Sequence, residues 1–129
     1  MSSEGKPQGY STVSVYIVTE GAQRVIDFLK STFDATVLCH FDTPDGKIMH
    51  AEVRIGDAVI MIADASERYR AFAVWLHVYV PDVEATYQKA LAAGGLSVEE
   101  PSRREGETDR RGGVRDSGGN TWWIATHGG

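Results

Sequence analysis

Apolar and polar residues alternate along this chain in an order that occurs twice. Alternation at every second position is typical of a half-buried strand, and recurrence at every third or fourth position is typical of an amphipathic helix. In the first half these patterns predict a strand, a helix and three further strands, at residues 13–17, 21–34, 36–42, 47–55 and 58–63. Gly56-Asp57 joins the last two strands as a two-residue loop of the kind that favours hairpins.

The second half repeats this order. A strand is predicted at 74–80, and Asp82 and Gly94 are typical first and last residues of the helix that follows. Short strands are predicted at 96–99, 114–116 and 121–127, with a charged, glycine-bearing loop at 101–113. This loop has two open interpretations, a solvated connection or a lid beside a cleft.

The repeated order predicts an α+β fold of two βαβββ modules, 12–64 and 74–127, that form a cleft or an incomplete barrel. A chain of 129 residues is expected to form one domain, here 10–129. It follows a polar arm, 1–9, that we expect to be disordered. Because we find no linear catalytic motif, we expect the function in side chains that face the cleft.

Because side chains alternate along a strand, their positions assign them to one or the other face of each sheet. The hairpin loop pairs Val53 with Ile60, so one face of this hairpin, which includes Met49, is wholly apolar and faces the helix. In the second module, the same alternation turns Trp122 toward the helix and Trp123 away from it. The opposite, mixed faces are expected to surround a pocket that contains Ser14, Tyr16, His50, Glu52, Arg54, Met61, Trp75, His77, Tyr79 and Trp123.

Charge and cysteine content narrow the class of protein. A net charge of −5 disfavours nucleic acid as a partner and is compatible with a cationic ligand. The single cysteine, Cys39, excludes an intrachain disulfide and fits a reducing compartment. No stretch approaches the ~18 apolar residues of a membrane span, and residues 1–8 lack the apolar core of a signal peptide. We therefore expect a cytoplasmic protein that does not contact a membrane.

Four phrases point to a known family: Val25–Leu29, Lys47–Asp57, Leu76–Val80 and Trp122–His127. With the paired modules, they make residues 12–127 resemble the vicinal oxygen chelate superfamily, which includes glyoxalase I, extradiol dioxygenases, and bleomycin- and fosfomycin-resistance proteins. The last three phrases resemble its PhnB-like, glyoxalase/bleomycin-resistance branch. The resemblance implies the glyoxalase/bleomycin-resistance/dioxygenase fold and a homodimer, but it specifies function weakly because this fold hosts many chemistries.

The resemblance also implies where a metal would lie. In metal-dependent members, the ligands come from inward positions on the first and last strands of each module, which fall here at Ser14, Met61, Trp75 and Trp123. A catalytic divalent ion needs imidazole and carboxylate donors, whereas serine and methionine are poor donors and tryptophan offers none. We therefore expect no metal and no cofactor at these positions, and we favour a binding protein over an enzyme.

A displaced metal site is the main alternative. His50, Glu52 and His77 offer the two imidazoles and one carboxylate typical of non-haem iron, which would support a lyase, isomerase or dioxygenase. The competing interpretation is a strand-face pair of His50 and Glu52 that hydrogen-bonds Arg54 or a ligand. Cys39 and His40 do not suggest a nucleophile and its base, because sequence neighbours on a strand point to opposite faces.

The function we favour from sequence is metal-independent binding of a small aromatic or cationic molecule, for example an antibiotic or toxic compound that is sequestered. An aromatic wall would supply stacking, and nearby polar groups would orient the ligand. The ligand-binding residues predicted are Tyr16, His50, Glu52, Arg54, Met61, Trp75, His77, Tyr79 and Trp123. A third hypothesis is a protein-interaction module whose cleft is filled by its own tryptophans.

Overall fold

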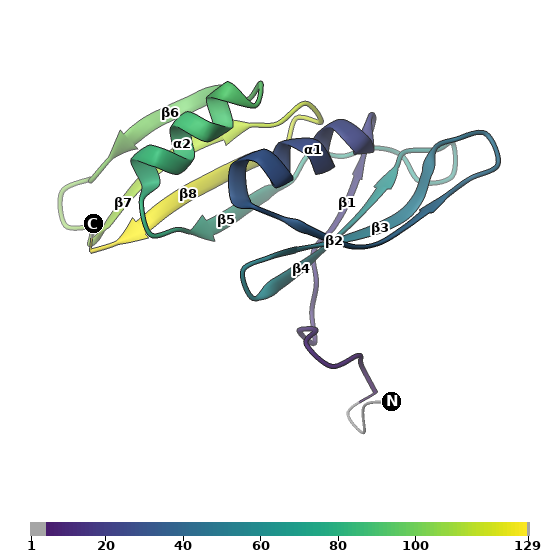
Figure 1. Ribbon diagram of the computed structural model, residues 1–129. Coiled ribbons are helices and arrows are strands. Elements are labelled where there is room, and N and C mark those ends of the chain that lie inside the picture. The colour runs from purple at the N-terminus through teal and green to yellow at the C-terminus, as the bar shows by residue number, and fades with distance from the viewer. Residues whose placement is uncertain (1–4, 129) are drawn as a thin grey trace.

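The computed structural model describes residues 5–128, which form two four-stranded sheets, each with one helix packed against it (Figure 1). Sheet 1 has the strand order β1-β4-β3-β2, and sheet 2 has the order β5-β8-β7-β6. The pairs β1–β4 and β5–β8 are parallel, and the other neighbours are antiparallel. The predicted α+β fold of two βαβββ modules is confirmed, and the sheets of the described chain do not close into a barrel.

The elements are β1 (Tyr16–Thr19), α1 (Ala22–Phe33), β2 (Thr36–Asp42), β3 (Ile48–Ile55), β4 (Ala58–Asp64), β5 (Trp75–Tyr79), α2 (Val83–Ala92), β6 (Leu96–Ser102), β7 (Asp109–Arg115) and β8 (Thr121–His127). Neither helix in the described range is long and apolar enough to cross a membrane.

The start of α1 is tied to sheet 1 by one carboxylate. Asp64, at the end of β4, accepts hydrogen bonds from the amides of Ala22 at 2.9 Å and Ile48 at 2.8 Å. A negative charge beside a helix N-terminus interacts favourably with the unpaired amides and dipole of that end. Asp64 therefore links the start of α1 to the start of β3 and the end of β4.

Both ends of α2 follow from its sequence. The Asp82 carboxylate accepts a hydrogen bond from the Ala85 amide at 3.1 Å, as an N-cap residue should. At the other end, Gly94 has a φ of 97°, and the amides of Gly94 and Gly95 bond to the carbonyls of Leu91 and Ala90. This pair of bonds is a Schellman motif, which favours glycine because its first residue past the helix is left-handed.

One core joins the two modules. Apolar side chains of α1 and sheet 1 form a single buried cluster with those of α2 and sheet 2, and Trp122 is its largest fully buried side chain. The Phe33 ring, at the end of α1, meets the Trp122 ring at 5.4 Å between centroids. On its polar edge, the indole nitrogen donates to Asp116 at 2.8 Å. Trp122 thus faces the helices, as predicted, and its neighbour Trp123 does not.

The structure corrects three predictions. Val13 is not in a strand: β1 begins at Tyr16, and the Val13 side chain is 83% exposed. The loop predicted at 101–113 is shorter and spans 103–108, because β6 continues to Ser102 and β7 already begins at Asp109. Met49 does not face the helix but is 57% exposed, because the β2–β3 register shifts next to it.

The N-terminal arm was predicted at residues 1–9, of which 1–4 lie outside the described residues. Its later part contacts sheet 1. The Gly9 carbonyl accepts a hydrogen bond from Arg54 at 3.2 Å, and the Tyr10 hydroxyl donates to Glu52 at 2.5 Å. The segment up to Tyr10 therefore reaches the mixed face of β3.

Replacing Asp116 should test the interaction that holds Trp122. Asp116 is 4% exposed and accepts hydrogen bonds from the amides of Gly118 and Asn120, the Asn120 side chain and the Trp122 indole. Asp116→Ala leaves these buried donors unpaired, so the free energy of unfolding should fall by about 3 kcal/mol. Urea denaturation measures it, with Glu100→Ala on exposed β6 as the control, which should stay within about 0.5 kcal/mol of the parent. Equal effects of the two substitutions would contradict this role of Asp116.

Candidate functional site

A carboxylate, Glu52, is the centre of a polar network on the mixed face of sheet 1. It accepts hydrogen bonds from the Tyr10 hydroxyl at 2.5 Å and from His50 Nε2 at 2.8 Å, and the Cys39 sulfur lies within 4.8 Å. The hydrogen bonds from His50 and Tyr10 hold the pKa of the Glu52 carboxyl below its ordinary value. Glu52 is therefore an anion at neutral pH, surrounded by donors.

The network continues from His50 to Tyr16. The Tyr16 hydroxyl lies 2.8 Å from His50 Nδ1, while Nε2 on the other side of the ring contacts Glu52. A neutral imidazole that donates from Nε2 to the carboxylate has Nδ1 free to accept from the tyrosine. Burial raises the pKa of the Tyr16 hydroxyl, so this tyrosine is a neutral hydrogen-bonding group rather than a phenolate. Tyr16 and His50 thus extend the polar network toward the neighbouring cavity.

A cavity of about 640 Å³ adjoins Tyr16. Its walls come from the ends of β1, β3 and β4 and from the connector after β4. Apolar surface makes up most of the lining, and the polar groups are hydroxyls, one ammonium and one carboxylate. The lining residues are Tyr16, Val18, Thr43, Lys47, Ile48, Met49, Ala63, Asp64, Ala65, Ser66 and Tyr69. Apolar walls with a few polar groups are the usual composition of a small-molecule site.

Two indoles lie together on the mixed face of sheet 2. The rings of Trp75 and Trp123 meet edge to face with centroids 5.3 Å apart, and Trp75 is 76% exposed. Trp123 lies over Gly113 on the neighbouring strand, where a Cβ atom would come within 2.6 Å of the ring. Its indole N–H is buried and has no hydrogen-bond partner among the described residues. Gly113 therefore makes room for an aromatic platform that retains an unused donor.

Charged side chains surround these indoles in a cavity of about 330 Å³. Arg104 pairs with Glu99 at 3.0 Å, and Arg111 pairs with Glu107 at 3.1 Å. Because these charges neutralise one another in pairs, the cavity beside Trp75 is aromatic without a strong net charge. Exposed pairs of this kind contribute little to stability.

A second carboxylate network lies on sheet 2. Asp109 accepts hydrogen bonds from Tyr79 at 2.8 Å, His127 at 2.7 Å and Arg111 at 3.2 Å. The bonds from His127 and Tyr79 hold the pKa of Asp109 below its ordinary value. Arg111 also donates through Nε to His77 Nε2 at 3.1 Å. Burial, reinforced by the Arg111 guanidinium, lowers the pKa of His77, so its ring is neutral at pH 7 and accepts from Arg111.

The structure brings the predicted site residues together as two groups. Tyr16, His50, Glu52, Arg54 and Met61 lie on sheet 1, where Tyr16 pairs with Met61 across the strands. Trp75, His77, Tyr79 and Trp123 lie on sheet 2. Within residues 5–128, no hydrogen bond, ion pair or ring contact connects the two groups. Their union in one pocket stays a prediction.

The positions of the family metal do not fit an ion chemically. Trp75 and Trp123 occupy two of the four family ligand positions, and their rings contact each other. Ser14, at a third position, precedes β1 rather than lying in it. The alternative set of His50, Glu52 and His77 is not assembled either, since His77 lies on the other sheet and is bonded to Arg111. The group that gathers in its place is Cys39, His50 and Glu52.

Sequence reasoning missed Tyr10, Cys39, Asp109 and Arg111. A bulge between Val37 and Cys39 turns the thiol onto the face of Glu52, and simple alternation cannot reveal it. Asp109 and Arg111 were assigned to a loop because the run of charged residues and glycines at 109–113 shows no apolar alternation, but they lie in β7. As predicted, Cys39 and His40 do not act together: His40 contacts Asp42 at 2.7 Å.

The chain belongs to the Glyoxalase/Bleomycin resistance protein/Dioxygenase superfamily, which it matches over residues 12–124. Uncharacterized protein Rv0887c of Mycobacterium tuberculosis (strain ATCC 25618 / H37Rv) is 32% identical over 125 residues, covering 87% of this chain and 72% of the relative.

Two solved structures show the same fold. TioX from Micromonospora sp. ML1 has a TM-score of 0.76 at 24% identity and covers 91% of this chain and 98% of its own. TnmS3, an antibiotic binding protein from Streptomyces sp. CB03234, has a TM-score of 0.70 at 14% identity, and the match covers 92% of this chain and 99% of TnmS3. The predicted superfamily and fold are confirmed.

Titration of His77 should report its contact with Arg111. A histidine whose pKa is lower in the folded protein than in the unfolded chain stabilises the fold at pH values above the unfolded pKa of 6.5. This contribution is lost as the pH falls toward the lower pKa of the folded state. In Arg111→Gln, the NMR titration midpoint of the His77 ring should rise toward the ordinary value. The ring signals of His40, which is exposed beside Asp42, are the internal control and should not be changed by the substitution at a given pH. A His77 midpoint that stays or falls would show that Arg111 is not responsible.

Proposed function

We propose that this protein binds a small, planar aromatic molecule without a metal ion and so sequesters it. The observation that carries this proposal is the contact between Trp75 and Trp123. Trp75 is 76% exposed, and the buried indole N–H of Trp123 has no hydrogen-bond partner among the described residues. Large exposed aromatic surface is unfavourable in a soluble protein unless it contacts a ligand or a partner. A flat molecule stacked on Trp75 would cover this surface, and an acceptor atom on it would satisfy the Trp123 N–H.

The chemistry around the pair supports a ligand that is aromatic and close to neutral. The cavity contains the ion pairs Arg104–Glu99 and Arg111–Glu107, so neither sign of charge dominates. Because the neutral ring of His77 accepts from Arg111 at Nε2, its Nδ1–H can donate one hydrogen bond and orient the ligand without adding charge. Tyr79, which contacts His77 edge to face at 4.7 Å, continues the aromatic surface along β5.

TnmS3 is described as an antibiotic binding protein and shares the fold at 14% identity. This likeness supports the idea that the fold can sequester an organic compound, and the aromatic residues of this chain supply the reason to place such a role here. The phrases Lys47–Asp57 and Trp122–His127 support placement in the PhnB-like branch. We further infer action in the cytoplasm, on the basis of a single, unpaired cysteine.

We also infer that the working form is a homodimer in which the mixed face of sheet 1 of one copy closes over that of sheet 2 of its partner. Both mixed faces expose large side chains, among them Phe41, Met49, Trp75 and Tyr79. Each sheet has its own polar network and cavity, and the described chain does not connect them. A second copy would complete a pocket from Tyr16, His50, Glu52, Arg54 and Met61 on one side and the indoles on the other.

Ligand binding in the presence of chelator is the direct test. In a thermal-shift screen of planar aromatic compounds with excess EDTA, at least one should raise the melting temperature. For that compound, Trp75→Ala and Trp123→Ala should each raise the Kd about tenfold, because stacking and burial are lost together.

Phe72→Ala is the matched control, since Phe72 is an exposed aromatic residue outside the Trp75 cavity, and its Kd should stay at the parent value. Hits that disappear with chelator would favour the metal-dependent lyase, isomerase or dioxygenase instead. A library without any hit would favour the protein-interaction module.

Mixing two defective variants tests the dimer. Sedimentation should give twice the chain mass of 14.1 kDa. Neither Tyr16→Ala nor Trp123→Ala should bind the ligand tightly alone. After joint unfolding and refolding, a mixed dimer should regain one intact pocket, built from sheet 1 of the Trp123 variant and sheet 2 of the Tyr16 variant. A monomeric mass, or no recovery in the mixture, would rule out the shared pocket.

A further inference from the structure

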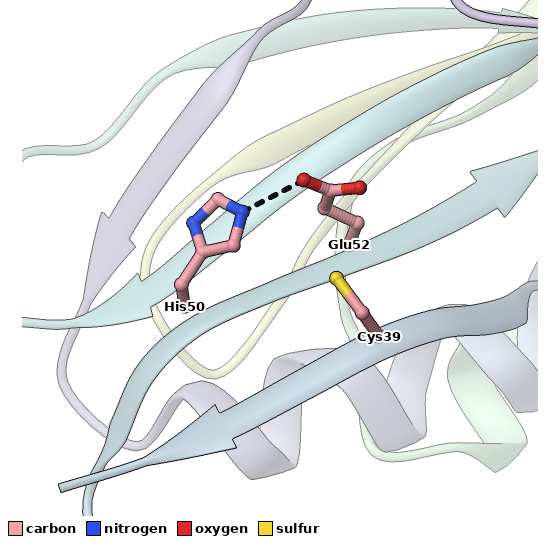
Figure 2. A group of neighbouring side chains, drawn as sticks. All are labelled: Cys39, His50 and Glu52. Atoms are coloured by element: carbon pink, nitrogen blue, oxygen red, sulfur yellow. Dashed lines mark hydrogen bonds and ion pairs between the residues drawn. The ribbon is translucent and has the colours of Figure 1, made fainter. Parts of the chain in front are cut away.

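Three different metal-binding side chains gather on the mixed face of sheet 1. The donor atoms of Cys39, His50 and Glu52 all lie within 4.8 Å of one another. His50 and Glu52 are two residues apart on β3, and Cys39 is directly opposite Glu52 on β2 (Figure 2). The sulfur lies beside the carboxylate, to which the imidazole points (Figure 2). The bulge at Val37/Cys39 places the thiol on this face.

The residues around these donors resemble the outer layer of a metal site. An imidazole that binds a metal through one nitrogen usually donates a hydrogen bond from the other, and a ligating carboxylate is usually hydrogen-bonded as well. Here the Tyr16 oxygen lies 2.8 Å from His50 Nδ1, and the Tyr10 hydroxyl donates to the Glu52 oxygen that does not face His50. Both supporting contacts leave His50 Nε2 and Glu52 Oε2 directed toward each other, at 2.8 Å.

We propose that Cys39, His50 and Glu52 bind a divalent transition-metal ion, Zn²⁺ or its spectroscopic substitute Co²⁺, with a fourth position open to water. A thiolate, an imidazole and a carboxylate form a donor set that suits Zn²⁺, whereas Mg²⁺ and Ca²⁺ require oxygen ligands. Tetrahedral bonds of about 2.0–2.3 Å separate donor atoms by about 3.3–3.6 Å. His50 Nε2 and Glu52 Oε2, now 2.8 Å apart, must therefore move apart slightly when the ion binds.

Binding of the ion exchanges protons in a defined way. The Cys39 thiol loses its proton to solvent and forms the metal–sulfur bond. The His50 proton moves from Nε2 to Nδ1, where the Tyr16 oxygen accepts it, and Nε2 then binds the ion. Burial and the Glu52 carboxylate raise the pKa of the Cys39 thiol in the free protein, so the ion competes with a proton and binds more tightly as the pH rises.

This site shares His50 and Glu52 with the sheet 1 side of the proposed pocket but lies apart from the Trp75–Trp123 stacking platform. It lies on sheet 1, beneath Tyr10 of the N-terminal arm, whereas Trp75 and Trp123 lie on sheet 2. It also differs from the family positions Ser14, Met61, Trp75 and Trp123. Ion binding at Glu52 would act on the contact to Tyr10, and so on the arm over sheet 1, rather than on the stacking platform.

Cobalt titration of tag-free protein tests the proposal. One equivalent of Co²⁺ should produce a thiolate-to-cobalt charge-transfer band in the near ultraviolet and visible bands of tetrahedral intensity, and Zn²⁺ should abolish both. Cys39→Ser should lose the charge-transfer band and weaken Zn²⁺ binding at least tenfold, as should Glu52→Gln. Tyr16→Phe should weaken it about tenfold through loss of the acceptor for His50. Affinity should be greater at pH 8 than at pH 6.

His40→Ala is the matched control, because His40 is the neighbour of Cys39 on β2 but contacts Asp42, and it should bind Co²⁺ as the parent does. Circular dichroism confirms that each variant is folded. Absence of a charge-transfer band in the folded parent, or parent-like Zn²⁺ affinity in Cys39→Ser, would overturn the proposal. Failure of the proposed function is separate, because aromatic ligand binding is measured in excess EDTA and with Cys39 intact.

Discussion

The fold depends on the burial of the Trp122 indole, a large aromatic ring with one polar N–H group. Trp122 is fully enclosed, and a buried indole N–H without a partner would cost the fold its desolvation penalty. Asp116, in the turn before β8, supplies the acceptor, and the Phe33 ring from the other module packs against the indole at a tilt. Because alternate residues on a strand point to opposite faces, anchoring Trp122 in the core obliges Trp123 to face the other way. The interaction that joins the modules thus also orients the aromatic platform.

The two mixed faces repeat one polar arrangement with different neighbours. On each, a carboxylate is held as an anion by a tyrosine and a histidine: Glu52 by Tyr10 and His50, and Asp109 by Tyr79 and His127. The surroundings then diverge, since sheet 1 adds a thiol and sheet 2 adds a guanidinium and two indoles. A duplicated module can therefore carry one donor-rich face and one stacking face, which gives the chain two chemically different surfaces on equivalent scaffolds.

Sequence pattern was sufficient for most of the scaffold. The α1 boundaries, β2, and the caps of α2 at Asp82 and Gly94 were predicted closely, because propensity, capping chemistry and periodicity agree there. Parity also separated Trp122 from Trp123. Prediction failed where a strand irregularity changed the face to which side chains point, as at Cys39 and Met49. It also failed where contacts between distant segments determined the partners of a residue. Nothing local in Tyr10 or Asp109 indicates a partner that is 42 or 18 residues away.

The bulges that reposition Cys39 have a counterpart in sheet 2. The outer strands β2 and β6 each contain two register irregularities, so their outward hydrogen-bonding groups do not form an even ladder. An incoming extended peptide would find a poor template on either, as it does on many natural sheet edges. Growth of the sheets into fibrils is thereby hindered at these two borders.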